Sequence, residues 1–281
     1  MSEMQSVPTT PPLLMAIHPA SGMGNQLFMV AALMHFAKKH GYHPVFWDRC
    51  QEQWEHHHSV FDIHAMLAHI RIITETERTS LDWTTTHFGE SFTFISPPEL
   101  PNTHIKLVGY FQAHAYVPRD FPTVPAPPRL ATELIGTPWH RTFFLHVRRG
   151  DYLHPANAHH NVQLTEYWRT CLSEMSVGLT CFVVSDDMEW CQQHLINEIG
   201  AALCERFKWT WCPNTCSDVE TFFWMTLCDA GGICANSTFS WWAAWYLKQR
   251  CGTTSVFMPR VWGLPPLPPA QDLHPPWAKQ R

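Results

Sequence analysis

The sequence predicts an α/β protein with two Rossmann-like units, on the evidence of two patterns. Short apolar runs that suit buried strands alternate with longer apolar-rich runs that suit helices, in both halves of the chain. A proline-rich segment, FPTVPAPPRL at 121–130, lies between the halves and is typical of a linker. We therefore expect an N-terminal domain over residues 1–125 and a C-terminal domain over 126–281, each with a parallel sheet.

The N-terminal half begins with a strand–helix–strand pattern. Residues 12–18 and 43–47 are the expected strands. Between them, residues 26–39 carry apolar side chains on most faces and are followed by Gly41, which is typical of a helix end. The middle of the chain, up to the proline-rich segment, is less regular.

The C-terminal half alternates more regularly. Strands are expected at 142–147, 180–184, 231–235 and near 255–258, and helices at 164–175, 187–199, 217–228 and 238–249. The proline-rich segment 264–276 predicts irregular structure. Because ligands of parallel α/β folds bind at the carboxyl ends of the strands, we expect a site in the loops that follow these strands.

Composition excludes several kinds of partner. Hydrophobic residues make up 45% of the 281 residues, charged residues 15%, and the formal net charge is −5, so we expect no nucleic-acid partner. No apolar run is long enough for a transmembrane segment, and the N-terminus MSEMQSVPTTPP is unlike a signal peptide. We therefore expect a cytoplasmic or soluble intracellular protein, although a piece of a membrane-associated Golgi enzyme would have the same composition. The ten cysteines include no Cys-x-x-Cys pair and predict buried or free thiols.

The segment between the first expected strand and helix combines glycines with amides. It contains Gly22, Gly24, Asn25 and Gln26, but a dinucleotide fingerprint would need a further glycine where Leu27 stands. Two interpretations remain open. The segment could offer backbone N–H groups and two amides to a polar ligand at the cleft. Alternatively, it could be a plain turn in which Asn25 caps the helix.

Two adjacent arginines follow the strand expected at 142–147. The sequence HVRRGDY places Arg148, Arg149 and Asp151 directly after that strand, with His146 near its end. Arginine suits a diphosphate because its planar fork matches phosphate oxygens and its charge persists at any working pH. Asp151 is placed to pin one guanidinium in a bidentate pair. A purely structural arginine–aspartate pair is the alternative interpretation.

Two further segments follow expected strands and open expected helices. The first segment, Ser185-Asp186-Asp187, could offer carboxylates to a base or a ribose. Alternatively, Ser185 or Asp186 could cap the helix. A Mg²⁺ site would need a third carboxylate, and none lies nearby in the sequence. The second segment, residues 236–240, could offer hydroxyls and backbone N–H groups to an anion. Alternatively, it could be an ordinary helix cap. We expect Trp241, Trp242 and Trp245 in the core. The candidate ligand-binding residues of the two segments are Ser185, Asp186, Asp187, Asn236, Ser237, Thr238 and Ser240.

Taken together and in order, these segments resemble glycosyltransferase family 11, the galactoside α-1,2-fucosyltransferases that use GDP-fucose. The resemblance spans 16–262 and is carried by the blocks GMGNQLF (22–28), LVGYFQ (107–112), HVRRGDY (146–152), VVSDDMEW (183–190), ANSTFSWWAAWYL (235–247) and FMPRVW (257–262). Segment 50–105 contains no block of the family, which puts the choice of acceptor in doubt.

The resemblance implies a B-type glycosyltransferase fold, with two Rossmann-like domains that face a cleft. It implies an acceptor-binding N-terminal half, a donor-binding C-terminal half, and inverting transfer of L-fucose from GDP-β-L-fucose to a galactose-containing glycan. It also implies no metal and no other cofactor, with the donor-phosphate arginines falling on Arg148 and Arg149. A metal-free enzyme must stabilise the leaving diphosphate with fixed cations and dipoles, and these arginines and the helix start at 237–240 are suitable groups.

Two other functions remain open. One is a related fucosyltransferase with another sugar or a protein as acceptor. The other is a non-catalytic carbohydrate-binding protein on the same scaffold. The presence of both arginines, of the Ser-Asp-Asp segment and of the Asn-Ser-Thr helix start favours an enzyme. The sequence does not identify the general base.

Overall fold

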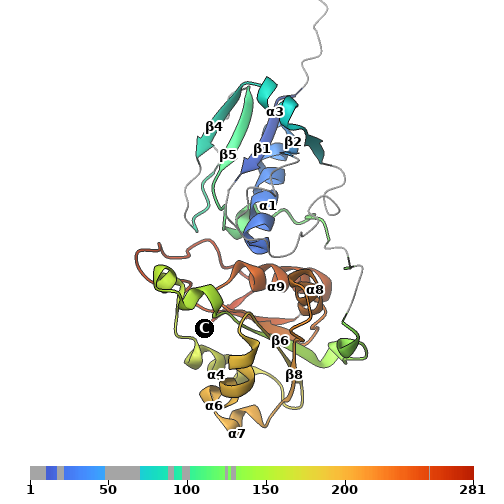
Figure 1. Cartoon of the computed structure of the whole chain (residues 1–281), viewed down its shortest axis with the longest axis vertical. Coiled ribbons are helices and arrows are strands. Elements are labelled where there is room, and N and C mark those ends of the chain that lie inside the picture. The colour runs from blue at the N-terminus through green and yellow to red at the C-terminus, as the bar shows by residue number, and fades with distance from the viewer. Residues whose placement is uncertain are drawn as a thin grey trace, which may run out of the picture.

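The computed structural model describes residues 11–17, 22–47, 70–87, 92–96, 102–123, 126–127, 131–252 and 254–281. It contains two parallel sheets, one from each half of the chain (Figure 1). The first sheet comprises β1 (Leu13–Ile17), β2 (His43–Trp47), β3 (Arg71–Ile73), β4 (Trp83–His87) and β5 (His104–Val108). The second comprises β6 (Thr142–Val147), β7 (Thr180–Ser185), β8 (Lys208–Trp211), β9 (Gly231–Ile233), β10 (Ser255–Met258) and β11 (Lys279–Gln280).

The strand order of the second sheet is that of a Rossmann fold. Its order is β8-β7-β6-β9-β10-β11, which in chain order reads third, second, first, fourth, fifth, sixth. The direction of winding therefore reverses between β6 and β9, which pair in parallel with Leu145 opposite Ile233. A crevice forms at such a switch point, outside the carboxyl ends of the strands. The segments after β6 and β9 are the ones that carry Arg148 and Asn236.

The first sheet has the order β3-β2-β1-β5-β4, and all its pairs are parallel. Two parallel α/β sheets in one chain confirm the predicted fold class, an α/β protein with two Rossmann-like units. The domain boundary expected at 125/126 stays a prediction.

The helices cover both sheets and differ from the prediction mainly at their ends. Their bounds are α1 (Met23–His40), α3 (Glu75–Ser80), α4 (Thr165–Glu174), α5 (Met188–Trp190), a π-helical turn (Cys191–Leu195), α6 (Ile196–Ile199), α7 (Ala201–Cys204), α8 (Asp218–Thr226) and α9 (Thr238–Cys251). The 3-10 turns are η1 (His114–Tyr116), η2 (Thr132–Leu134), η3 (Trp139–Arg141), η4 (Gly150–Leu153) and η5 (Pro155–His160). The helix expected at 187–199 is thus interrupted by the π-turn. Segment 264–276 contains no helix or strand, as predicted.

Helix α1 begins three residues before the expected start at residue 26. Its N-cap is Gly22, which makes no side-chain cap bond, so Asn25 lies inside the first turn. The interpretation of Asn25 as the helix cap is therefore wrong. Gly24 lies in this first turn, where a Cβ would lie 2.4 Å from the carbonyl carbon of Thr238. The chain needs glycine at this point to bring α1 against α9.

An aromatic contact joins α1 to α9, and with it the two halves of the chain. The ring centroid of Phe28 lies 4.6 Å from that of Trp241 and 5.1 Å from that of Trp242. Both tryptophans are fully buried and Trp245 nearly so, which confirms their predicted place in the core. Figure 1 shows the lower end of α1 meeting the helical layer that contains α9. The first turns of these two helices consequently lie side by side.

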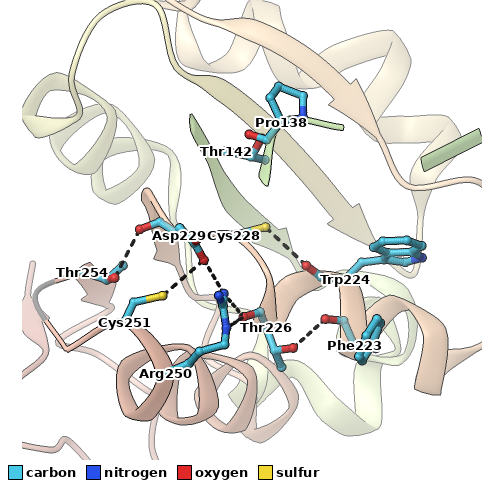
Figure 2. A network of polar contacts seen from close by, with 10 residues as sticks. All are labelled: Pro138, Thr142, Phe223, Trp224, Thr226, Cys228, Asp229, Arg250, Cys251 and Thr254. Carbon is cyan, nitrogen blue, oxygen red and sulfur yellow. Dashed lines mark hydrogen bonds and ion pairs between the residues drawn. The ribbon is translucent and has the colours of Figure 1, made fainter. Parts of the chain in front are cut away.

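A polar network lies at the amino end of the strands of the second sheet, opposite the arginine segment (Figure 2). Arg250, near the end of α9, pairs with Asp229 and donates to the Thr226 carbonyl over 2.6 Å. Cys251 and Thr254 also donate to Asp229, to its carboxylate and its carbonyl respectively. Because Asp229 precedes β9, this network ties α8 and α9 to the amino end of the strand.

The cysteines within the described ranges are free thiols and most are buried, as predicted. In the part of the chain that the structure describes, no helix is both long enough and apolar enough to cross a membrane.

Candidate functional site

The first arginine after β6 is held between two carboxylates. Nη2 of Arg148 lies 2.6 Å from Oδ1 of Asp151, and its Nη1 lies 3.1 Å from Oδ2 of Asp186. The expected bidentate pair with Asp151 is therefore wrong, because the two ends of the fork bind different residues. Asp151 is the more exposed partner, with 46% of its side chain accessible against 24% for Asp186.

The second arginine is packed in a separate environment. Nε of Arg149 lies 3.0 Å from Oδ2 of Asp187, and its guanidinium stacks 3.7 Å from the centroid of the Trp190 ring. The ion pair and the cation–π contact act on the same planar group, so they hold it in one orientation. The two arginines therefore differ: Arg149 is stacked on an aromatic ring, and Arg148 bridges two acids.

Asp186 organises the arginine segment from the neighbouring strand. Its Oδ1 accepts the backbone N–H of Arg149 over 2.9 Å while its Oδ2 faces Arg148. A Cβ at position 150 would lie 2.3 Å from that Oδ2, so Gly150 leaves the room that the carboxylate needs. Glycine after the two arginines is thus explained by close approach of Asp186 and not by a positive φ.

The charge of this cluster is nearly balanced. Burial acts to lower the pKa of Arg148, but the carboxylates of Asp186 and Asp151 raise it above its usual value. Together, the two guanidinium groups and the three carboxylates at residues 151, 186 and 187 sum to −1. The carboxylates of the cluster therefore balance both guanidinium charges.

His146 lies beneath the arginines with its side chain almost fully buried, at 3% exposure. Burial, with a contribution from the charge of Arg148, lowers the pKa of His146 to about 3. Its Nδ1 has no hydrogen-bond partner among the described residues, and its ring lies 5.7 Å from that of Phe239. His146 is therefore a neutral imidazole at physiological pH, placed between the arginine segment and the start of α9.

The Ser-Asp-Asp segment begins its helix differently from the expectation. Asp187 is the N-cap, and its Oδ1 accepts the N–H of Trp190 over 3.2 Å. Ser185 instead accepts the N–H of Asp187 over 3.0 Å. A cap at Ser185 or Asp186 is therefore wrong. Asp186 and Asp187 contact the arginine segment directly, and Ser185 binds the backbone of Asp187.

Most polar side chains at the start of α9 bind backbone groups. Nδ2 of Asn236, which is buried, donates to the carbonyls of His160 and Trp262 over 2.8 and 2.9 Å. Ser237 is the N-cap and accepts the N–H of Phe239, while Ser240 donates back to the Ser237 carbonyl. These contacts match the capping interpretation of the segment. Thr238 differs from them, because its hydroxyl binds a side chain of the N-terminal half.

Thr238 meets the amide segment of α1 at the contact between the two halves. Its hydroxyl donates to Oδ1 of Asn25 over 2.8 Å, and Nε2 of Gln112 donates to the same oxygen over 2.7 Å. Phe111, which precedes Gln112, has a positive φ of 52°, a conformation that is strained for a residue with a side chain. Gln112 lies within LVGYFQ, and the sequence assigned it no role. Of the other predicted residues of this segment, Gly24 packs against the backbone of Thr238 and Phe239, and Gln26 is buried.

The structure thus brings the predicted residues together in two groups. Arginines and carboxylates from the segments after β6 and β7 form the first group, and Asn25, Gln112 and Thr238 form the second. His146 and Phe239 link the two groups through their ring contact. Within the described ranges, no three His, Cys, Asp or Glu side chains gather closely enough to hold a metal ion.

Comparison with known proteins points to glycosyltransferases. Residues 127–260 match the family model Glycosyl transferase family 11, a region that contains the arginine segment, the Ser-Asp-Asp segment and the start of α9. Two curated relatives from Escherichia coli match part of the chain. An alpha-1,2-colitosyltransferase is 33% identical over 115 residues, and the O-antigen biosynthesis glycosyltransferase WbnK is 31% identical over 126 residues.

These relatives are matched over less than half their length. The aligned parts cover 39% and 43% of this chain, and 38% and 39% of the two relatives. Among solved structures, the fucosyltransferase NodZ from Bradyrhizobium superposes with a TM-score of 0.45 and 12% identity, over 84% of this chain and 93% of NodZ. NodZ co-crystallized with GDP gives a TM-score of 0.47 at the same identity, over 84% of this chain and 92% of NodZ.

Proposed function

We propose that this protein is a glycosyltransferase that transfers L-fucose from GDP-β-L-fucose to a galactoside hydroxyl, forming an α-1,2 linkage with inversion. The observation that carries the proposal is the arginine pair at the carboxyl end of β6, beside the switch point of a Rossmann-type sheet. Nucleotide phosphates bind at such a position. The match of residues 127–260 to a glycosyltransferase family supports the same assignment.

In the proposed reaction, the diphosphate of the donor takes the place of Asp151 on Arg148. Asp151 is the natural group to leave, because its side chain is half-exposed and ion pairs of exposed groups contribute little. Asp186 then keeps Nη1 of Arg148 in place while Nη2 turns to a phosphate oxygen. Arg149 keeps its stack on Trp190 and holds the segment in shape.

Catalysis then follows from charge development. As the bond between fucose and phosphate breaks, negative charge increases on the diphosphate, and a fixed guanidinium interacts with it more strongly. Losing one such preorganised donor typically costs ~100- to 1000-fold in rate. The scheme needs no metal, since Arg148 and the N–H groups at the start of α9 supply the positive charge and dipoles that stabilise the diphosphate. Asn25 and Thr238 place the acceptor-side half next to this point.

The donor experiment tests the proposal directly. GDP should bind the purified protein in calorimetry with EDTA present, and GDP-fucose should be consumed only when a galactoside is added. Binding that requires Mg²⁺ or Mn²⁺ would contradict the metal-free scheme. No binding of any guanine nucleotide would contradict the function as a whole, and it would favour a non-catalytic carbohydrate-binding role.

A second donor has specific support. One of the matched relatives is named for transfer of colitose, which is a deoxy analogue of L-fucose. GDP-colitose should therefore be compared with GDP-fucose, GDP-mannose and UDP-galactose on the same panel of galactosides and on glycoprotein acceptors. If kcat/KM is higher for GDP-colitose than for GDP-fucose, the donor sugar in the proposal becomes colitose, and the proposed binding site stays the same.

A further inference from the structure

His160 stacks on Tyr152, the tyrosine whose ring lies against Arg148, and it also contacts the ring of His159. The imidazole of His160 lies parallel to the Tyr152 ring, with centroids 4.9 Å apart and an angle of 20° between the planes. The guanidinium of Arg148 lies 5.3 Å from the centroid of that same ring. Tyr152 thus lies between an ionisable histidine and the arginine that we propose binds the diphosphate.

The stack is held by hydrogen bonds to the two segments that follow β9 and β10. The Tyr152 hydroxyl donates to the Asn236 carbonyl over 3.0 Å, and Asn236 in turn donates to the His160 carbonyl. The N–H of Leu264 donates to the carbonyl of His159 over 2.7 Å, which fastens the end of η5 to the segment after β10. Position 160 is consequently held rigidly beside the site.

The charged neighbours of His160 are those of the proposed phosphate site. Burial lowers the pKa of His160, as do the charges of His159 and Arg148, whereas Asp151 acts to raise it. The segments after β9 and β10 contribute the neutral Asn236 and the apolar Leu264 to this corner. The charge state of His160 therefore depends on the same arginine and carboxylate that the diphosphate would rearrange.

We propose that His160 is a proton-linked positioning residue of the diphosphate site, and that it takes up a proton when a nucleoside diphosphate sugar binds. The inference rests on the proposed function. The bound diphosphate neutralises Arg148, and it displaces Asp151, whose carboxylate then needs a new cation. An imidazolium at position 160 supplies that cation, and a second positive charge near the diphosphate strengthens its binding.

The sign of the pH dependence follows from this exchange. The pKa of His160 is low in the free protein because of burial and the nearby cations, and it rises when the diphosphate arrives. Affinity for the ligand therefore increases as the pH falls through the pKa of the bound form, and it levels off below the pKa of the free form. No proton uptake is expected well above both values.

GDP-fucose without acceptor is the suitable probe, because a diphosphate esterified at both ends has no phosphate group that titrates near neutral pH. Calorimetry at pH 6.5 in buffers of different ionisation enthalpy counts the protons taken up on binding. The wild-type protein should take up about half a proton more than His160→Gln, and its affinity should rise about three- to tenfold more between pH 8 and pH 6. His140→Gln is the matched control, since His140 is exposed in η3, which precedes β6 and so lies at the opposite end of this strand from the arginine segment.

Each outcome decides between specific statements. Equal proton uptake by the wild type, His160→Gln and His140→Gln would overturn the inference while leaving donor binding intact. Failure of all three proteins to bind GDP-fucose, GDP or GDP-colitose would contradict the proposed function itself. If His160→Gln does not fold, proton uptake by the wild type alone serves as the test, and a value of zero overturns the inference.

Discussion

The side-chain oxygen of Asn25 accepts a hydrogen bond from the hydroxyl of Thr238, a residue 213 positions later in the chain, over 2.8 Å. This bond joins the first turn of α1, which follows the first sheet's β1, to the first turn of α9, which follows β9 of the second sheet. A second donor, Gln112, reaches the same oxygen. With its oxygen engaged twice, the amide of Asn25 has one defined orientation, and its NH₂ group points away from both donors.

Two variants of Asn25 distinguish its structural role from direct contact with a ligand. Asn25→Ala leaves the Thr238 and Gln112 donors without their acceptor and should cost about 1–3 kcal/mol of stability as well as turnover. Asn25→Asp keeps an acceptor oxygen but replaces the NH₂ group by a negative charge. We expect it to restore most of the melting temperature and not the kcat. Full activity in the aspartate variant would show that the amide NH₂ contacts no ligand.

Gly24 and Gly22 form a matched pair for testing the contact between α1 and α9. In Gly24→Ala the new methyl group would lie 2.4 Å from the Thr238 carbonyl carbon, so the helices must separate, at a cost of about 1–3 kcal/mol. Gly22→Ala meets no atom within 4 Å, so it should lose only the preference for glycine at the N-cap and cost less than Gly24→Ala. Urea unfolding of both variants measures the difference. Equal unfolding curves would mean that α1 can shift without cost.

The two arginines should respond differently to lysine. Arg148→Lys keeps the charge but loses the fork that spans Asp151 and Asp186, so kcat should fall about 100-fold or more, with a smaller change in KM for the donor. Arg149→Lys loses the stack on Trp190 and should mainly lower the melting temperature. Arg250→Lys, far from the site, is a control for loss of an arginine network (Figure 2). The reverse pattern would assign the phosphate to Arg149.

His146 predicts a specific dependence of stability on pH. Its pKa is lowered to about 3 in the folded protein by burial, against about 6.5 in the unfolded chain. Below pH 6.5 His146 is protonated in the unfolded state and stays neutral in the folded state. Its contribution to the free energy of unfolding therefore falls by up to ~1.4 kcal/mol per pH unit. His146→Gln removes that contribution. The difference in unfolding free energy between the two proteins should therefore shrink between pH 7 and pH 5, and parallel curves would contradict the assignment.

Strands with apolar residues on both faces were predictable from the sequence, and edge strands were not. Every residue of β6 is buried, and its bounds match the expected 142–147. By contrast, β4 has the polar sequence WTTTH with mostly exposed side chains, and β11 has two residues, so neither shows a hydrophobic period. Both were missed for that reason.

The site was predictable as a set of segments, and its pairings were not. Position after a strand was enough to select the arginines and the Ser-Asp-Asp segment. Which carboxylate meets which guanidinium depends on the register of β6 against β7, which places Val147 opposite Ser185. The role of Gln112 depends on a turn with a positive φ at Phe111, and a sequence pattern does not reveal such strain in a residue other than glycine.

The surplus of one carboxylate in the arginine cluster has a kinetic consequence. A patch with a net positive charge accelerates the arrival of an anion from a distance, and it does so most strongly in dilute salt. Around Arg148 and Arg149 the acids cancel that field, in a chain whose overall charge is already −5. The association rate constant for a nucleotide should therefore depend only weakly on ionic strength. Selection among anions would then occur at close range, by which of them can displace Asp151.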